Sequence, residues 1–293
     1  MEIVGLGLTV VDLMVIVETF PQIDSKQEAQ QSLVQVGGPV PTALAQLTRF
    51  GWTCRHLSAW GDDPLGRVIE HNLKETGISH PESCRQSDAK TGFSQVWVER
   101  SNGQRTTVTQ RPIITEVLSK VDLVKELTEC EVLHLDGWPT RDALIAARTV
   151  KARGGRVFVD TGSPKPGIEE LLSLADYVNA PRRFVEELLQ VTDSERGAVA
   201  IAAMGPSSVT VTDGEHGAWL AAQGRTFYQP AVRTGPIVDT NGAGDVFTGA
   251  MIHAVLSDWP PLQALRFAVT ASGLKCTRLG NREALPTLDT IVL

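Results

Sequence analysis

The pattern of apolar and polar positions predicts two kinds of β-structure in this chain. Residues 2–8 form a mostly apolar run that is too short for a typical helix, which indicates a buried strand of a parallel sheet. Partial alternation of apolar and polar residues follows in four segments, at 11–19, 27–36, 92–99 and 105–110. We expect these four segments to pair as a small separate sheet, a lid formed from about residues 11–36 and 92–111.

From residue 132 onward the pattern alternates between whole elements. Strands are predicted at 132–135, 156–160, 177–178, 208–212, 218–222 and 226–228, and helices at 140–153, 168–175, 182–189, 194–203, 243–256 and 262–277. Pro139 and Pro181 stand at predicted helix starts, and Gly154 follows a predicted helix end. This order predicts an α/β fold: a single domain over residues 1–293 with a doubly wound, mostly parallel sheet flanked by helices, plus the small lid.

Composition and charge narrow the class of partner. The chain of 293 residues is 42% hydrophobic and carries a net charge of −7, which argues against a broad nucleic-acid or anionic membrane surface. No run approaches the about 20 apolar residues that cross a bilayer. The first basic residue is Lys26, so the start lacks the charged region of a secretory signal. We expect a cytoplasmic protein with a small-molecule substrate and neither nucleic acid nor membrane as a partner.

The most informative string is D-T-N-G-A-G-D-V-F at residues 239–247, where a glycine-rich loop becomes a helix. Without bulky side chains, the backbone N–H groups of Gly242, Ala243 and Gly244 can point at one anion, which the positive helix end also attracts. Asp245 then lies in the first helical turn, where we expect it to stay ionised and to accept a proton from a substrate hydroxyl. The alternative is an ordinary glycine-rich helix start in which Asp245 only complements the helix dipole.

This string resembles the D-T-x-G-A-G-D-x-F signature of the ribokinase-like (PfkB) carbohydrate kinases and matches it at every fixed position. Further features recur in the family's order over nearly the whole chain: Asp12 after the first strand, the glycine pair Gly37 and Gly38, G-D-D-P-L-G at 61–66, T-D-G-E-H-G at 212–217, and T-R-L-G at 277–280. The resemblance implies a doubly wound core and a β lid that covers the sugar.

The resemblance also implies roles. Asp245 is the catalytic base, and residues 242–244 form the anion hole for charge that develops on the transferred phosphate. Asp12 accepts hydrogen bonds from sugar hydroxyls, and Gly37 and Gly38 let the backbone approach the substrate, although a strand-end carboxylate and a plain hinge are the simpler interpretations. Thr212, Gly214 and Gly217 match the nucleotide loop, a spacing also typical of a hairpin turn. Asp239 and Asn241 match positions that help form a monovalent-cation site in many members.

The sequence departs from the family pattern at several positions. Thr42 stands where an asparagine normally contacts the sugar, so sugar selectivity is open. In the family's N-x-x-E motif, which helps place magnesium, Asn179 is kept but Arg182 replaces the glutamate. Either a glutamate one turn later, Glu186 or Glu187, assists the metal, or Arg182 contacts the nucleotide itself; we favour the second. Ala284 replaces a serine of some potassium-activated members, which leaves K⁺ activation open.

Together these features predict an ATP- and Mg²⁺-dependent kinase of a small ribose- or ketose-like carbohydrate. A nucleoside or a hexose phosphate is the alternative substrate, since Trp97 could stack on a base and Arg105 could hold a phosphate. A sugar or nucleotide sensor with weak catalysis is the alternative from another class, which the retained Asp245 disfavours. Lid sheets in this family often pair across a homodimer, in which case the four lid strands should present an apolar outer face.

Overall fold

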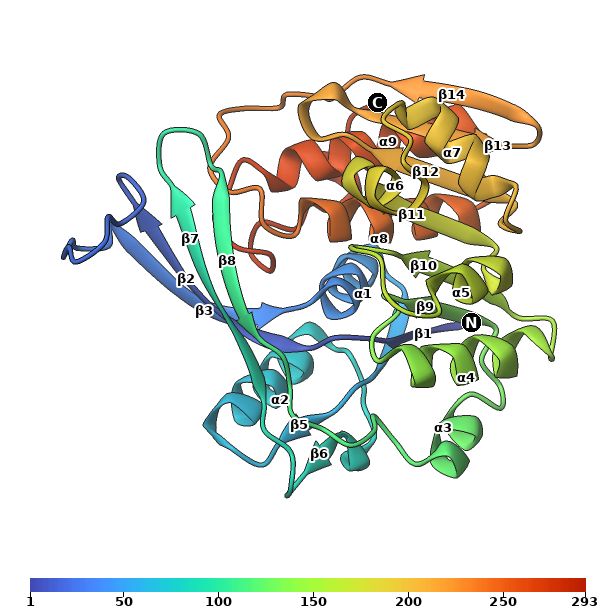
Figure 1. Ribbon diagram of the computed structural model, residues 1–293, viewed down its shortest axis with the longest axis horizontal. Coiled ribbons are helices and arrows are strands. Elements are labelled where there is room, and N and C mark those ends of the chain that lie inside the picture. Colours follow the sequence, from blue (N-terminus) through green and yellow to red (C-terminus); the bar gives the residue numbers. More distant parts are fainter.

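Two β-sheets organise the chain (Figure 1). The computed structural model describes residues 1–293, apart from the side chains of residues 120 and 121. The larger sheet has eight strands in the order β14-β13-β12-β11-β10-β9-β1-β4, and the smaller one, the lid, has four in the order β3-β2-β7-β8. The sequence expectation of an α/β core with a separate small sheet is confirmed.

The central sheet is parallel from β4 to β12, and β13 and β14 extend it as antiparallel strands. Its strands are β1 (Glu2–Leu6), β4 (Thr53–Leu57), β9 (Val132–Leu135), β10 (Arg156–Asp160), β11 (Tyr177–Pro181), β12 (Ser208–Thr212), β13 (Ala218–Ala222) and β14 (Arg225–Gln229). Prediction identified the six strands from β9 to β14 but ended β11 too early, at residue 178; the ladder with β12 continues to Pro181.

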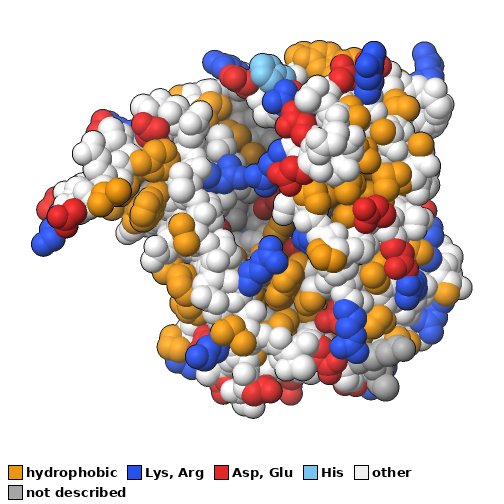
Figure 2. Space-filling view, viewed as in Figure 1, with side chains coloured by type: hydrophobic (Ala, Val, Ile, Leu, Met, Phe, Trp, Pro, Cys, Tyr) orange, Lys and Arg blue, Asp and Glu red, His pale blue; other side chains and the backbone are white. Residues whose placement is uncertain are grey.

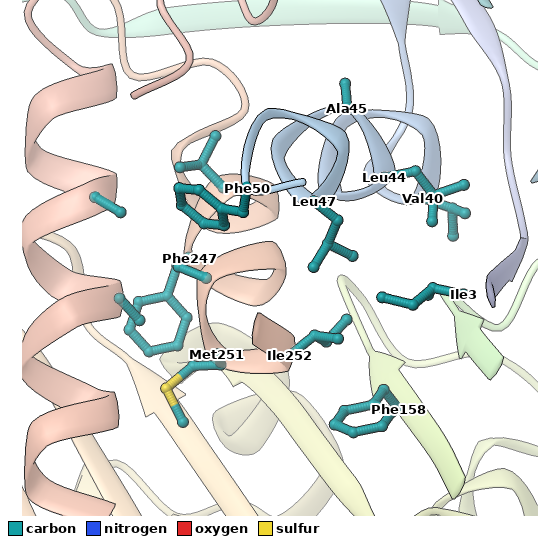
Figure 3. Close-up of a cluster of buried hydrophobic side chains, with 14 of the residues drawn as sticks. Ile3, Val40, Leu44, Ala45, Leu47, Phe50, Phe158, Phe247, Met251 and Ile252 are labelled. Atoms are coloured by element: carbon teal, nitrogen blue, oxygen red, sulfur yellow. The ribbon is translucent and has the colours of Figure 1, made fainter. Parts of the chain in front are cut away.

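Helices cover both faces of this sheet because successive strand residues point to opposite sides. On one face, Ile3 and Phe158 pack with α1 (Pro39–Arg49), α2 (Pro64–Thr76), α8 (Ala243–Leu256) and α9 (Pro261–Lys275), as Figure 3 shows for α1 and α8. On the other face, Val4 and Val157 pack with α3 (Lys120–Glu126), α4 (Thr140–Lys151), α5 (Ile168–Leu174), α6 (Arg182–Leu189) and α7 (Ser194–Ala202). Helix α1 is buried from Val40 to Leu47 because it lies between α8 and the sheet.

The chain reverses its winding at β1. Strand β1 pairs with β4 on one side and with β9 on the other. The chain therefore continues from β1 toward one edge of the sheet, at β4, and later builds the other part of the sheet from β9 onward. In open α/β sheets such a point leaves a crevice at the carboxyl ends of the strands, where ligands bind. Here those ends carry Asp136 after β9 and Asp160 at the end of β10.

The lid leaves the core at this same edge. It consists of β2 (Val10–Val17), β3 (Gln31–Gly37), β7 (Gly92–Glu99) and β8 (Arg105–Gln110). Strand β3 begins four residues later than predicted because its partner β2 ends at Val17, and the first pair of the ladder joins Ile16 to Gln31. A further short pair, β5 (Trp60–Gly61) with β6 (Arg85–Gln86), lies below the lid.

Strand register separates the two faces of the lid. Asp12 lies opposite Ser94 and shares its face with Met14 and Val96, which pack together. The odd-numbered residues of β2 point the other way, and the outer face therefore gathers Leu13, Val15, Val34, Phe93, Trp97 and Val108. Val34 and Val108 are more than half exposed, at 55% and 62%. The expected apolar outer face is present.

Within the part of the chain that the structure describes, no helix combines the length and the apolar character that a membrane span requires. All four cysteines are buried free thiols. Neither observation points to a further functional site.

Candidate active site

The glycine-rich loop forms an amide cradle at the start of α8. Gly242 caps the helix with φ of 76°, a conformation that glycine adopts without strain. Among the described residues, the N–H groups of Gly242, Gly244 and Asp245 have no protein acceptor, whereas the N–H of Ala243 lies 3.3 Å from the carbonyl of Thr240. The prediction that residues 242–244 all present their amides therefore needs a correction: Ala243 is engaged and Asp245 takes its place.

Space for a ligand lies beside this cradle. A Cβ at Gly244 would meet no atom within 4 Å, and Gly244 is exposed. Figure 2 shows the surface hollowed between the lid and the main body, with Lys or Arg side chains across its opening. Unpaired N–H groups at a helix N-terminus beside open space form an anion-binding site.

The carboxyl of Asp245 lies within this cradle and is unpaired. Among the described residues none donates a hydrogen bond to it, and only burial and neighbouring charges act on it. Burial raises its pKa to about 7, the charges of Asp160, Asp12 and Asp136 raise it further, and Arg105 opposes them. Because several carboxyls share a poorly solvated site, the Asp245 carboxyl keeps its proton to a higher pH than an ordinary aspartate does. Its role as the ionised base stays a prediction.

Asp12 reaches the same pocket from the lid. Its Oδ2 accepts a hydrogen bond from Nδ2 of Asn241 at 3.2 Å, and burial raises its pKa to about 6. A Cβ at Gly37 would lie 2.3 Å from Oδ1 of Asp12, and one at Gly38, whose φ is 110°, would lie 2.1 Å from the carbonyl of Leu8. The glycine pair is therefore required by packing against Asp12 and the strand before it, and does not act merely as a hinge.

A buried network behind Asp245 contains Asp160, a residue that the sequence analysis missed. Thr248 donates to Oδ2 of Asp160 at 2.7 Å, and Asn179 donates to Thr248 at 2.9 Å. Thr210 in turn donates to Oδ1 of Asn179 at 2.8 Å. Asn179 is only 2% exposed, and its side chain helps to orient Thr248 and Asp160. A role of Asn179 toward the nucleotide stays a prediction. The signal that could have found Asp160 is a lone carboxylate at the end of a predicted parallel strand.

Asp136 is the second carboxylate that the sequence analysis missed. It follows β9 at the reversal of winding, and its two oxygens accept from the N–H groups of Leu8 and Trp138, both at 2.8 Å. Burial raises its pKa to about 6, and Lys165 opposes the rise. Asp136 thus ties the end of β1, where the lid begins, to the end of β9.

Thr42 does not present a free hydroxyl to the pocket. It is fully buried, and its oxygen lies 3.3 Å from Nδ2 of Asn281 and 3.3 Å from Nη1 of Arg282. Arg282 lies close enough to Asp12 and Asp245 to interact electrostatically with both, although burial lowers its pKa to about 10. Thr42 therefore supports Arg282, a cation of the pocket that sequence reasoning did not identify.

Among the predicted nucleotide residues, Arg182 lies beside the loop at residues 212–217. Nε of Arg182 lies 3.3 Å from Glu186 and 3.3 Å from Asp213, which follows Thr212. The loop is a tight turn between antiparallel β12 and β13, in which a Cβ at Gly217 would lie 2.1 Å from the carbonyl of Gln229. Gly214, with φ of 53°, would meet no atom. Arg182 thus joins the N-x-x-R segment to this loop.

The tip of the lid touches the glycine-rich loop. Arg105 on β8 donates to the carbonyl and the hydroxyl of Thr240, at 3.3 and 3.1 Å, and Thr240 donates its hydroxyl to the carbonyl of Gly103 at 3.1 Å. Arg105 shares the inner face with Asp12, whereas Trp97 lies on the outer one. The idea that Trp97 stacks on a ligand in this pocket is therefore wrong.

The proposed monovalent-cation site contains a lysine. Nζ of Lys275 donates to the carbonyl of Asp239 at 2.7 Å and to Oδ2 at 3.0 Å. Asn241 and Gly280 donate their N–H groups to Oδ1 and Oδ2 of the same carboxylate, at 2.7 and 2.9 Å. Because every oxygen of Asp239 already has a donor, these residues do not fit a bound K⁺ ion.

A magnesium ion would bind here together with the nucleotide, unlike a resident metal ion. Among the described residues no cluster of three or more His, Cys, Asp or Glu side chains could hold a resident metal. Mg²⁺ is commonly bound by one or two carboxylates together with substrate phosphates and water. Asp160, whose charge acts on Asp245 beside the amide cradle, fits that mode.

Comparison with known proteins agrees with this fold. The family model described as pfkB family carbohydrate kinase matches residues 2–288. The chain is 22% identical to ketohexokinase of Mus musculus, over 94% of this chain and 96% of the relative, and 27% identical to fructokinase of Vibrio alginolyticus, over 90% and 93%. The structure of Arabidopsis thaliana ribokinase complexed with ribose and ATP superposes with a TM-score of 0.80, at 22% identity over 99% of this chain and 97% of that one.

These findings define a phosphotransferase that acts on a sugar hydroxyl. The chain belongs to the pfkB family of carbohydrate kinases.

Proposed function

We propose that this kinase transfers the γ-phosphate of ATP to a hydroxyl of a ribose- or ketose-like sugar, with Asp245 as the base. The observation that carries the proposal is the environment of Asp245: its carboxyl is unpaired, its pKa is raised to about 7, and it lies in the turn that presents free amides. A base is most effective when its pKa lies near the working pH. The pKa of Asp245 meets this condition.

The reaction then proceeds by positioning and electrostatics. Asp245 accepts the proton of the sugar hydroxyl as that oxygen forms its bond to the γ-phosphorus in line with the bond to the β-phosphate, which breaks and releases ADP. The amides of Gly242, Gly244 and Asp245 donate to the phosphoryl oxygens, where negative charge is concentrated during transfer. Mg²⁺ bound with ATP would neutralise phosphate charge, with Asp160 as a candidate ligand.

Residues of the lid and the pocket floor hold the sugar in this proposal. The carboxylate of Asp12 accepts hydrogen bonds from sugar hydroxyls, and Asn241, which now donates to it at 3.2 Å, supplies a second polar group. The names of the relatives, fructokinase, ketohexokinase and ribokinase, favour a ketose or a pentose. The absence of Trp97 from the inner face disfavours a nucleoside, whose base would need a stacking partner.

Arg182 serves the nucleotide in this scheme. Its guanidinium bridges Glu186 and Asp213, and its side chain is 45% exposed. Because the guanidinium is already partly in contact with water, it can exchange one carboxylate for a phosphate oxygen without burying a further charge. Thr212, Gly214 and Gly217 form the turn beside it, where the nucleotide's base and ribose would lie. A glutamate at position 182 could not make this contact.

The test is ATP consumption by the purified protein against pentoses, ketohexoses, hexose phosphates and nucleosides. Asp245→Asn is the inactive variant, and Asp142→Asn is a matched control, because Asp142 is a buried carboxylate on α4 that accepts only from the N–H of Val117 at 2.9 Å. We expect turnover with a ketose or pentose, lost in Asp245→Asn and kept in Asp142→Asn. Binding of ATP or a sugar without any turnover would replace the kinase by a sensor.

We also propose a homodimer that pairs through the lid. Support comes from the apolar outer face, where Val34 and Val108 are more than half exposed, and from β8, an edge strand exposed along its whole length. Val34→Lys with Val108→Lys should give a monomer in light-scattering mass measurements. A monomeric wild-type protein would contradict the proposal.

A further inference from the structure

A fully buried ammonium group lies directly behind the amide cradle. Lys275 is the last residue of α9, and neither it nor Asp239 is exposed to solvent. Nζ donates both to the main-chain carbonyl of Asp239, at 2.7 Å, and to its carboxylate, at 3.0 Å. Burial lowers the pKa of Lys275, while the Asp239 carboxylate favours its charged form. The ammonium therefore bridges two oxygens of one residue, which is how a metal cation would bind them.

The other partners of Asp239 complete this centre. The N–H of Asn241 and the N–H of Gly280 use the remaining capacity of the carboxylate, at 2.7 and 2.9 Å. A second cation beside these oxygens would lie a few ångströms from the ammonium in a site without water, where like charges repel strongly. The centre thus accepts one positive charge, and Lys275 already supplies it.

This centre lies at the root of the anion-binding loop. It joins the end of α9, the turn at residue 280 and the start of the loop at residue 239, only three residues before Gly242. Two further contacts fix the same loop, the Ser272 hydroxyl on the carbonyl of Ala243 at 3.0 Å and the N–H of Val238 on the carbonyl of Cys276 at 2.8 Å. The position of the cradle amides therefore depends on α9.

We propose that Lys275 is a built-in monovalent cation: its ammonium positions the anion-binding loop through Asp239, in place of K⁺, so that this kinase needs no added monovalent cation. Lys275 is a positioning residue, since it touches Asp239 and not the reacting atoms. The activity part of this inference rests on the proposed kinase function.

The first experiment measures phosphoryl transfer in KCl and in tetramethylammonium chloride at equal ionic strength. We expect the wild-type rate to be the same in both salts. Lys275→Met should lose about tenfold or more of kcat in tetramethylammonium chloride, because the Asp239 carboxylate is left buried without its charge partner. KCl should restore part of that loss, because K⁺ can then approach the Asp239 oxygens that have lost their ammonium partner. Lys151→Met, which breaks the half-exposed pair of Lys151 with Asp176 on the far side of the sheet, is the control and should show no salt-specific change.

A second readout does not require activity. The Tm of Lys275→Met should be lower than that of the wild type by several degrees and should rise in KCl but not in tetramethylammonium chloride, whereas the wild-type Tm should be alike in both. If no sugar is turned over, the kinase proposal fails while this ion-specific Tm shift still tests Lys275. Activation of the wild type by K⁺ overturns the inference. So does a folded Lys275→Met variant whose activity or Tm is insensitive to K⁺. If Lys275→Met does not fold, the wild-type comparison decides, and Lys275→Arg, which keeps the positive charge, should be as indifferent to K⁺ as the wild type; activation of Lys275→Arg by K⁺ overturns the inference.

Discussion

Asp245→Asn should abolish phosphoryl transfer and at the same time stabilise the fold at alkaline pH. An asparagine cannot accept the proton of the sugar hydroxyl, so transfer stops. The same change removes a carboxylate that is held in a poorly solvated pocket among other carboxyls without a single hydrogen bond. A variant that loses activity and gains stability shows that the charge of Asp245 is unfavourable in the folded protein. Replacement of a residue that merely supports the structure would lower the stability instead.

The size of the gain follows from the pKa. A carboxyl whose pKa is higher in the folded than in the unfolded chain destabilises the fold once it ionises, and the penalty is absent below the unfolded value of 3.8 and complete above the folded value of about 7. At 1.36 kcal/mol for each pH unit between these values, the penalty is at most about 4 kcal/mol at pH 8 and about 2 kcal/mol at pH 5. Because neighbouring carboxyls titrate together with Asp245, part of this energy is shared with Asp160.

Calorimetric or denaturant unfolding at pH 8 and pH 5 measures this difference. The variant should exceed the wild type in free energy of unfolding by up to about 4 kcal/mol at pH 8, and the difference should shrink by about half at pH 5. Asp142→Asn, in which the hydrogen bond from Val117 is weakened, should show no such gain at either pH. An Asp245→Asn protein that is no more stable than the wild type at pH 8 would refute the reasoning about the pocket.

Three other outcomes follow from the same geometry. Below pH 7, kcat/KM should fall about tenfold per pH unit as Asp245 becomes protonated. Arg105→Ala should move this acid limb of the pH profile to higher pH, because the Arg105 charge lowers the pKa of Asp245. An acid limb near pH 4 would contradict the assignment. Arg182→Ala should raise the KM for ATP severalfold and leave the sugar KM unchanged, and steady-state kinetics with an unaltered ATP KM would exclude the proposed contact. Gly37→Ala should raise the sugar KM by an order of magnitude, because its Cβ displaces Asp12, and titration with the sugar checks this.

The fold was largely predictable because its signals are local. Alternating strands and helices after residue 132 gave the parallel sheet, and glycines and prolines marked the ends of its elements. The start of β3 was not predictable, since it depends on where its partner β2 ends. Strand β4 was also missed, because in Thr53–Leu57 only three of five residues are hydrophobic or aromatic and the burial of His56 depends on its neighbour β1.

The site was predictable only where one string carries it. The segment 239–247 indicated both the cradle and Asp245, but not which amides remain free, since that depends on the Thr240 carbonyl. Asp160 and Lys275 escaped because neither belongs to a local motif; their roles appear only when strands and helices bring distant residues together. The same holds for the pKa of Asp245, which neighbours at positions 12, 136 and 160 set jointly.

The contact between Asp12 and Asn241 also bears on how the enzyme is made. The two residues are 229 positions apart in the chain, although their side chains lie 3.2 Å from each other. At about 5–20 residues per second, a ribosome needs on the order of ten to fifty seconds to synthesise what lies between them. During that interval the Asp12 side of the pocket exists without the glycine-rich loop. In the proposed mechanism, a nascent chain therefore acquires Asp245 and the amide cradle only once the last helices have left the ribosome and packed.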